Sequence, residues 1–226
     1  RKLDPSVRNL DANNYSSAKE AYNSIRAKFK EDEAEGRMFQ IPLLDACRRW
    51  PGDRLRIAAL GAIEKTPPET PLKDKDYRVL HDGTHFVQVS NEIVIRDRLD
   101  APSAGDASAV MVACKECRRA GHGVVFALAC DVSQAHRRYV HREEDWGLLA
   151  CRASDDDPAN LWINRTGTFG VGSASIWWGR LIAALGRIPA YLSGQDWLFE
   201  LIYADDLLTI ACGPNMWLSL LITLTM

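Results

Sequence analysis

The run Trp197-Leu-Phe-Glu-Leu-Ile-Tyr-Ala-Asp205-Asp206-Leu-Leu-Thr-Ile210 places two adjacent carboxylates between two apolar segments. Two such segments joined by a short polar step are typical of a β-hairpin, so both acids are expected at its tip. Adjacent like charges repel, and a nearby cation is therefore expected to neutralise them. Oxygen ligands at a tight turn suit a hard divalent ion such as Mg²⁺.

Length and composition describe a folded chain without a strong overall charge. The chain has 226 residues, of which 46% are hydrophobic, and its formal net charge is −2. These values fit one large domain or two small ones with a substantial core. Residues 1–150 hold 24 of the 28 Lys and Arg residues, so a surface that binds a polyanion is expected in that part.

The cysteines and the termini indicate an intracellular fragment. Six cysteines are scattered without a dense framework and no signal peptide opens the chain, which predicts reduced thiols and a location in the cytoplasm or nucleus. The longest apolar stretch, residues 216–226, is too short to span a bilayer, so no membrane association is expected. The chain starts with Arg and stops inside an apolar run, and both ends are interpreted as cuts.

Periodicity and turn residues predict an alternation of helices and strands. A capping box at Ser17 predicts a helix over 17–35, and Asp106 and Gly121 bound a helix over 107–120. The apolar run 123–130 is expected to be a strand buried on both faces. The remaining expected elements are a strand from 77 to 91, a short helix over 133–141, a hairpin of 148–152 with 161–164, a helix over 173–185 ended near Gly186 and Pro189, and a last helix after 210.

Asp131 is a third candidate metal ligand because it directly follows the apolar run 123–130. If this strand lies beside the 197–210 hairpin, Asp131 and Asp205 meet in space. Three carboxylates from neighbouring strands can hold two Mg²⁺ ions about 3.5–4 Å apart, the arrangement used in two-metal phosphoryl transfer. One ion would activate the attacking hydroxyl, and the other would stabilise the leaving pyrophosphate.

Two motifs resemble the metal-binding motifs of reverse transcriptases. Tyr203-Ala-Asp-Asp206 is similar to the Tyr-x-Asp-Asp box of that family, and Asp131-Val-Ser-Gln-Ala-His136 looks like its first metal motif. The resemblance implies that Asp131, the backbone carbonyl of Val132, Asp205 and Asp206 bind metal. It also implies that Gln134 and Ala135 lie beside the triphosphate and that His136 senses the sugar 2′-hydroxyl.

Two further segments resemble the substrate side of the same family, in the same order. Phe169-Gly-Val-Gly-Ser-Ala-Ser175 resembles the box that approaches template and incoming nucleotide, which implies nucleotide binding at Gly170. A helix N-terminus with bare N–H groups suits that role. The segment Tyr77-Arg78-Val-Leu-His-Asp82 is similar to the fingers motif whose Arg grips the triphosphate, with assistance from Lys73 or Lys75.

The resemblance covers about 70–226 and implies an α+β fold. It implies a polymerase palm, with an antiparallel sheet backed by helices, and partial fingers without a thumb. Residues 66–226 would form the fingers and palm, and residues 1–65 an unassigned helical extension. The implied function is a retroelement RNA-directed DNA polymerase (a nucleotidyltransferase) that uses two Mg²⁺ ions, or Mn²⁺ in their place, a dNTP and an RNA or DNA template with primer.

The same residues also allow other interpretations. His136 stands where the family usually has Tyr or Phe and Ser175 where it usually has Pro, which favours a catalytically inactive remnant that at most binds nucleic acid. An RNA-dependent RNA polymerase is a third interpretation. The acids could be a solvated turn or a helix cap, Arg78 could pair with Asp82, and the glycines could form a plain loop.

Four other features suggest sites but have simpler explanations. Cys114-x-x-Cys117 with His122 resembles a zinc knuckle, but its spacing to Cys130 does not fit one. The acids at 155–157 are expected to form a solvated turn. At least one of Trp177 and Trp178 is expected in the core. The pairs Arg118-Arg119 and Arg137-Arg138 and the nearby Arg142 could contact phosphate or could serve surface solubility.

Overall fold

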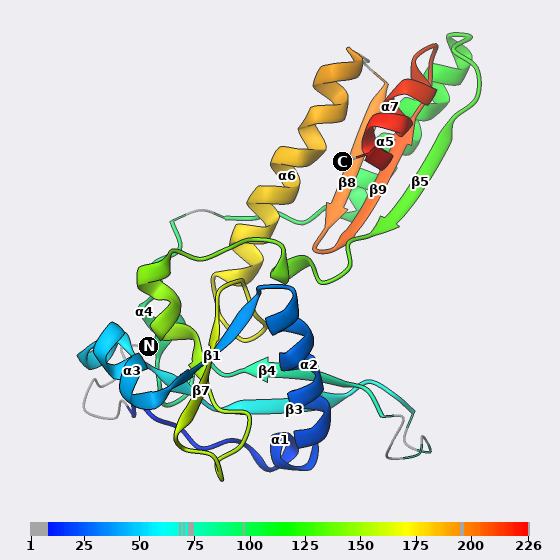
Figure 1. The fold of residues 1–226 in the computed structure, drawn as a ribbon. Coiled ribbons are helices and arrows are strands. Elements are labelled where there is room, and N and C mark those ends of the chain that lie inside the picture. Colours follow the sequence, from blue (N-terminus) through cyan, green and yellow to red (C-terminus); the bar gives the residue numbers. More distant parts are fainter. Residues whose placement is uncertain are drawn as a thin grey trace. The chain divides into compact units, whose positions relative to one another are not determined.

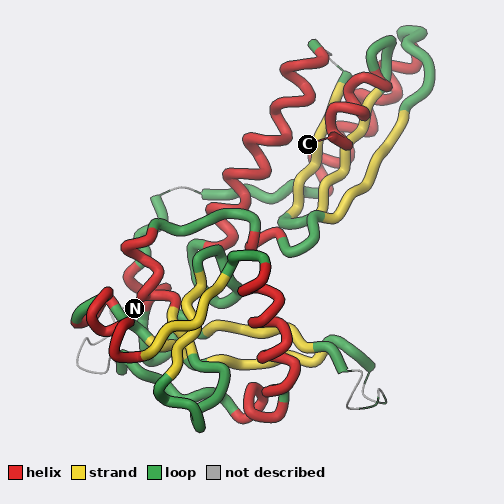
Figure 2. Tube along the Cα trace, viewed as in Figure 1, coloured by secondary structure: helices red, strands yellow, loops and turns green. Residues whose placement is uncertain are grey.

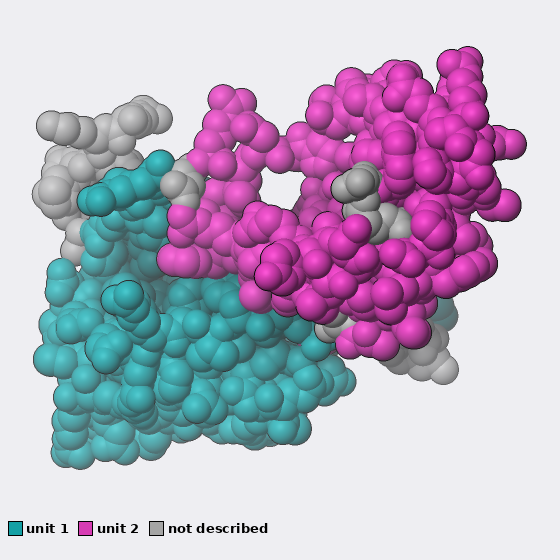
Figure 3. Space-filling model, turned by 90° about the horizontal axis from the view of Figure 1, so that it is seen from above, with its two compact units in different colours: residues 1–96, 136–174 teal, residues 97–135, 175–226 magenta. Residues whose placement is uncertain are grey.

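The computed structural model describes residues 9–67, 69, 71, 75–96, 98–194 and 197–225. The fold is a mixed α+β fold, and the chain divides into two compact units that Figure 3 colours separately. Unit 1 comprises Arg1–Arg96 and His136–Ala174, and unit 2 comprises Asp97–Ala135 and Ser175–Met226. The two units therefore alternate along the chain, and each is described by itself.

Unit 1 contains two sheets. A four-stranded sheet has the order β1-β7-β6-β2, in which β7 runs antiparallel to both neighbours and β2 runs parallel to β6. Its strands are β1 (Met38–Pro42), β2 (Ile57–Ala58), β6 (Ala150–Cys151) and β7 (Asn160–Asn164). The second sheet is an antiparallel pair, β3 (Leu60–Glu64) and β4 (Tyr77–His81). The boundary expected between residues 65 and 66 falls between these two paired strands.

Figure 1 labels the α-helices of unit 1, and apolar side chains of these helices pack in clusters with strand residues. The α-helices are α1 (Ser16–Glu20), α2 (Tyr22–Ala34), α3 (Leu43–Arg49) and α4 (Val89–Glu92), and the 3₁₀-helices are η2 (Gly52–Arg54), η4 (Ala135–Arg137) and η5 (Glu143–Leu149). Ile25 and Phe29, one turn apart on α2, pack into one core cluster with Met38, Leu60 and Trp162.

Unit 2 is built on a three-stranded antiparallel sheet with the order β5-β9-β8, which Figure 2 shows as three neighbouring strands. The strands are β5 (Phe126–Asp131), β8 (Leu198–Tyr203) and β9 (Asp206–Ala211). The expected hairpin of 197–210 is therefore confirmed. The expectation that the 123–130 strand is buried on both faces is wrong, because β5 is an edge strand whose side chains are largely exposed.

Helices α5 (Ala104–Arg119), α6 (Ala174–Ser193) and α7 (Met216–Thr225) complete unit 2. Val110 and Cys114 of α5 pack on the sheet face that carries Leu208 and Ile210. Side chains alternate between the two faces of a strand, so Ala211, which packs against α7, lies on the opposite face. The last helix expected after residue 210 is confirmed as α7.

Several expected helix boundaries are wrong, and tertiary contacts explain the differences. The 17–35 helix breaks at Ala21, and Ser17 forms no cap because its Oγ accepts a hydrogen bond from the Ala62 N–H of β3 at 3.2 Å. Helix α5 begins after Ser103, with Asp106 three residues into the helix as the reciprocal member of a capping box. The expected helix over 133–141 is only the three-residue η4, and the strand expected over 77–91 ends at His81.

Helix α6 continues through Gly186 and Pro189, where the sequence predicted its end. The pyrrolidine ring removes one backbone donor, but Pro189 is fully buried and packing outweighs that loss. Gly186 allows the β8 side chains to lie close to α6, since a Cβ at this position would lie 2.6 Å from Glu200 Oε2 and 2.9 Å from Ile202 Cδ1. Among the helices of the described residues, none is long and apolar enough to cross a membrane.

Cys117 of α5 and Cys212, which follows β9, form a disulfide in unit 2. The expectation of reduced thiols is wrong for this pair, because the two elements bring side chains 95 positions apart in sequence into bonding contact. Cys117 is consequently occupied and is not available as a zinc ligand in this state. Cys47, Cys114, Cys130 and Cys151 carry free thiols.

Glu200 makes the stability of unit 2 dependent on pH. Burial of this side chain against α6 raises its pKa to about 7 from 4.5. Between pH 4.5 and pH 7 the Glu200 carboxyl is therefore protonated in the folded state but ionised in the unfolded state. The stability that this proton contributes is lost as the pH rises through 7. Glu200→Gln, which mimics the protonated acid, is expected to raise unfolding stability at pH 8 by about 1–2 kcal/mol, allowing for partial solvent screening.

Thermal unfolding at pH 5 and pH 8 checks this expectation, with Glu116→Gln on the exposed face of α5 as the matched control. The control should change neither melting temperature. An equal gain for Glu200→Gln at both pH values would contradict a titrating Glu200.

Candidate active site

Three acids lie at one end of the unit 2 sheet. Asp131 ends β5 and is the register partner of Asp206, the first residue of β9, while Asp205 belongs to the turn before it. Residues directly opposite in an antiparallel pair share a face, so the Asp131 and Asp206 side chains project to the same side. The sequence-predicted meeting of β5 with the acidic hairpin is therefore confirmed, although 74 positions separate Asp131 from Asp205.

The hairpin tip is held from two sides. Ala204 adopts a left-handed conformation with φ 55°, which is unfavourable for any residue with a Cβ. Its carbonyl accepts a hydrogen bond from the Trp178 indole Nε1–H of α6 at 2.7 Å. The next carbonyl, that of Asp205, accepts from the backbone N–H of Val132 at 2.9 Å. The backbone around the acids is thus fixed by contacts to α6 and β5.

A groove of about 650 Å³ adjoins the acids within unit 2. One wall is the start of α5, including Ser103 and Ala107, and the other is the sheet face with Tyr203, Asp131 and Asp206. The N-terminal end of a helix carries a partial positive charge that favours nearby carboxylates. The two acids therefore face a concave surface rather than open solvent alone.

The donor set fits a hard divalent ion. Asp131, Asp205 and Asp206 are exposed carboxylates, and oxygen ligands are what Mg²⁺ and Mn²⁺ take. As the side chains stand, no group of three or more His, Cys, Asp or Glu in the described part of the chain is gathered closely enough to hold a metal ion. The backbone register places Asp131 opposite Asp206, with Asp205 in the adjoining turn, and all three side chains are exposed.

The residues that follow Asp131 have mixed environments. Val132 is partly buried and its N–H is used by Asp205. Gln134 is exposed and has φ 55°, so it is a second non-glycine residue near the acids with a left-handed backbone conformation. Ala135 is buried, so its side chain serves packing and only its backbone could meet a ligand. Strained backbone of this kind clusters at functional sites.

Three of the residues expected to contact the nucleotide, Arg78, His136 and Gly170, lie in unit 1, where Arg78 and His136 contact one ring. The Arg78 guanidinium of β4 lies 5.3 Å from the ring centre of Phe169, and His136 meets the same ring edge-on at 4.9 Å. Asp82 does not pair with Arg78, because it accepts hydrogen bonds from the Tyr15 hydroxyl at 2.5 Å and from His85 Nδ1 at 2.8 Å. Lys75 pairs with Glu64, and Lys73 lies outside the described residues.

Gly170 is required by the backbone of its loop. Its φ is 96°, and an added Cβ would lie 2.0 Å from the carbonyl oxygen of His81. The loop is tied to the end of β4 by the His81 N–H, which donates to the Phe169 carbonyl at 3.0 Å. Ser90 Oγ accepts from the Gly172 N–H at 3.0 Å, so this N–H is not bare as expected.

Gly170→Ala is expected to destabilise unit 1 by about 1–3 kcal/mol, because the new Cβ meets backbone in a left-handed conformation. Gly172→Ala is the matched control, since its nearest neighbour, Ser90 Cβ, would be 3.5 Å away at ordinary contact distance. Chemical denaturation of both variants measures the difference. Equal stability of the two variants would show that the loop accommodates Ala at 170.

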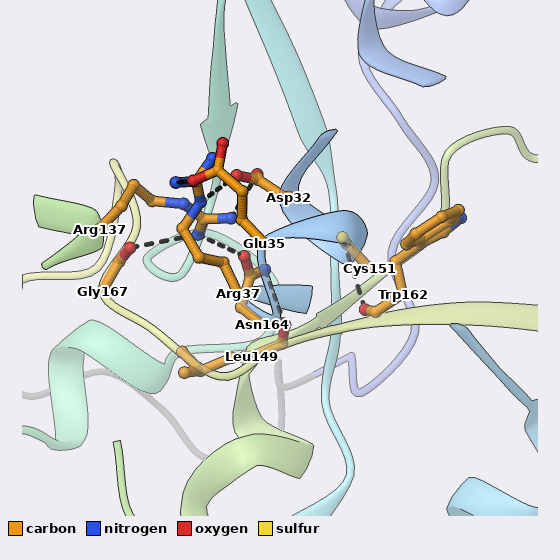
Figure 4. A network of polar contacts seen from close by, with 9 residues as sticks. All are labelled: Asp32, Glu35, Arg37, Arg137, Leu149, Cys151, Trp162, Asn164 and Gly167. Atoms are coloured by element: carbon orange, nitrogen blue, oxygen red, sulfur yellow. Dashed lines mark hydrogen bonds and ion pairs between the residues drawn. The ribbon is translucent and has the colours of Figure 1, made fainter. Parts of the chain in front are cut away.

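Arg137 was expected on the surface, but it is partly buried, with 11% of its side chain exposed, in a polar network of unit 1 (Figure 4). Its guanidinium pairs with Asp32 of α2 and donates to Asn164 Oδ1 at 2.7 Å and to the Gly167 carbonyl at 3.2 Å. Asp32 also accepts from Arg37 Nε at 2.6 Å. The interpretation that Arg137 contacts phosphate is therefore wrong, because Asp32 already balances the charge of its guanidinium.

Trp178 is the residue of this site whose contact with the acidic turn the sequence did not reveal. The pair Trp177-Trp178 predicted at least one core residue, which is confirmed by the burial of Trp178. Its hydrogen bond to Ala204 depends on how α6 packs, and no spacing in the sequence signals it.

The acids at 155–157 were expected to form a solvated turn, and this expectation is wrong for Asp155. Its carboxylate accepts a hydrogen bond from the Asn14 N–H at 3.0 Å and pairs with Lys19.

Comparison of the chain with protein-family models gives no match, and comparison with curated proteins gives none either.

Proposed function

We propose that this chain is a reverse transcriptase-like, RNA-directed DNA polymerase. One observation carries the proposal, namely that Asp131 and the Asp205-Asp206 turn come together at one end of an antiparallel sheet, with Asp131 opposite Asp206. Carboxylates supplied by neighbouring strands suit two-metal nucleotidyl transfer. Under the proposal, the β5-β9-β8 sheet with its helices is the palm.

The reaction follows from the acids and the proposed substrates. The primer 3′-hydroxyl loses its proton to water and its oxygen bonds to the α-phosphorus of a dNTP. The bond from this phosphorus to the oxygen that bridges to the β-phosphate breaks, and pyrophosphate leaves with both electrons of that bond. Two Mg²⁺ ions, when bound, supply charge neutralisation at the triphosphate and the attacking oxygen. Asp131, Asp205, Asp206 and the Val132 carbonyl would hold them, and the two held carbonyls of the turn keep the acids in place.

The substrate roles are those that the sequence resemblance implies. Arg78 would neutralise triphosphate charge, and His136 would sense the sugar 2′-hydroxyl. Both side chains rest on the Phe169 ring, which limits their motion and so favours a fixed binding geometry. Gln134 would approach the nucleotide through its exposed side chain, and Ala135 and Gly170 through their backbone. Unit 1 would be the fingers, in an intracellular polymerase of a retroelement.

Primer extension tests the proposal. With an RNA template, an annealed DNA primer, dNTPs and Mg²⁺, the chain is expected to add nucleotides complementary to the template. Asp205→Asn is expected to add none. Retained binding of the RNA–primer duplex without extension would favour the inactive remnant. His136 and Ser175, which depart from the usual residues of the family, also favour that alternative.

A further inference from the structure

Trp178 and Trp177 are neighbours on α6 with opposite environments. Trp178 is 3% exposed, whereas Trp177 is 49% exposed and stacks with Arg180 at 5.4 Å. A buried indole N–H needs an acceptor, because an unpaired donor in the interior is costly. Trp178 finds its acceptor in the Ala204 carbonyl, which lies between Tyr203 and the acid pair.

The hydrogen bond acts on the one strained residue of the acidic turn. Ala204 has φ 55°, a conformation that costs about 1–2 kcal/mol for a residue with a Cβ. A two-residue connection between the register partners Tyr203 and Asp206 requires a positive φ, and the indole N–H fixes the orientation of the Ala204 carbonyl within that connection. The Val132 N–H holds the next carbonyl, so the Trp178 indole and β5 fix two consecutive peptide groups.

We infer that Trp178 is a positioning residue for the metal-binding acids. Its indole N–H holds the Ala204 peptide so that Asp205 and Asp206 keep the backbone geometry in which divalent ions bind. The metal in this role rests on the proposed function. The control of the turn by the indole rests only on the hydrogen bond between Trp178 and Ala204. Trp178 touches neither metal nor substrate in this account.

Two measurements on the full chain test the inference, with Trp178→Phe as the variant and Trp177→Phe as its matched control. Hydrogen exchange of the 203–206 amides should become about three- to tenfold faster in Trp178→Phe, as expected for loss of one hydrogen bond. Mn²⁺ affinity, measured by electron paramagnetic resonance, should fall by about the same factor. Trp177→Phe should change neither quantity.

A second variant separates the hydrogen bond from packing. An amino-acid analogue with benzothiophene in place of indole at position 178 keeps the shape and loses only the N–H donor. It should reproduce both effects while the melting temperature stays near that of the unmodified chain. Unchanged exchange at 203–206 in this variant would overturn the inference.

The outcomes for Trp178 and for the polymerase are distinguishable. Faster exchange at the turn together with weaker Mn²⁺ binding supports the positioning role, whether or not primers are extended. Faster exchange in a chain that binds no Mn²⁺ overturns the metal part of the inference and the proposed function together. Primer extension with unchanged exchange and Mn²⁺ affinity overturns the role of Trp178 alone.

Discussion

Asp131→Asn is expected to abolish Mg²⁺-dependent primer extension, with a loss of about a thousandfold or more. A metal held by carboxylates supplies several kcal/mol of transition-state stabilisation, and each 1.36 kcal/mol is a factor of ten in rate. The same change removes one of two carboxylates that lie directly opposite in the β5–β9 ladder. Like charges in such a pair repel, so the metal-free variant should melt at the same temperature or slightly higher.

The combination of lost activity and retained stability distinguishes a functional acid from a structural one. Extension is measured with saturating dNTP, and melting is measured without divalent ions. Asp156→Asn, at an exposed position of the 155–157 turn of unit 1, is the control and should retain full activity. Retained extension by Asp131→Asn would remove this acid from the site, and a large drop in its melting temperature would assign it a structural role.

Arg137→Met is expected to destabilise unit 1 by about 3 kcal/mol, which corresponds to a fall of about 6–12 °C in melting temperature for a chain of this size. Arg137 is 11% exposed and Asp32 17% exposed, so the pair is largely removed from water. Loss of the guanidinium leaves Asn164 Oδ1 and the Gly167 carbonyl without this donor. Arg37 still pairs with Asp32, which keeps the cost near the lower end for a broken buried pair.

A double-mutant cycle with Asp32→Asn isolates the interaction. The two single changes should be non-additive by more than about 0.5 kcal/mol, because the residues share one network. Arg142→Ala, at an exposed position of the same segment, should change stability by less than about 0.5 kcal/mol. Additive effects of Arg137→Met and Asp32→Asn would contradict a direct ion pair. Arg137 directly follows His136, so its anchoring also limits movement of that ring.

Elements whose formation depends on neighbouring residues in the sequence were predicted correctly. The acidic hairpin was predictable because two apolar segments flank a single polar step, and β8 and β9 confirm it. Helix α7 and the β6–β7 hairpin were predictable for similar reasons. The pairing of β5 with β9 was predicted only on the condition that the two strands are neighbours, because periodicity does not specify which strand lies beside which.

Features that depend on distant contacts were not predictable. Asp32 and Arg137 are 105 positions apart, and two arginines in an otherwise polar stretch give no sign that one of them is buried. Helix α6 continues past Pro189, whose side chain is fully buried, and Ser17 leaves its expected cap because its hydroxyl accepts a hydrogen bond from β3. The hydrogen bond of Trp178 to the acidic turn belongs to the same class, since a Trp pair predicts only burial.

A titration with a divalent metal shows whether Asp131, Asp205 and Asp206 form one metal site. Mn²⁺ is titrated into the chain in the presence of a dNTP and its free concentration is followed by electron paramagnetic resonance. Saturable binding is expected for the unmodified chain, with loss in Asp131→Asn and in Asp205→Asn and retention in Asp156→Asn. Binding that is absent from the unmodified chain, or equal in all four proteins, would contradict it.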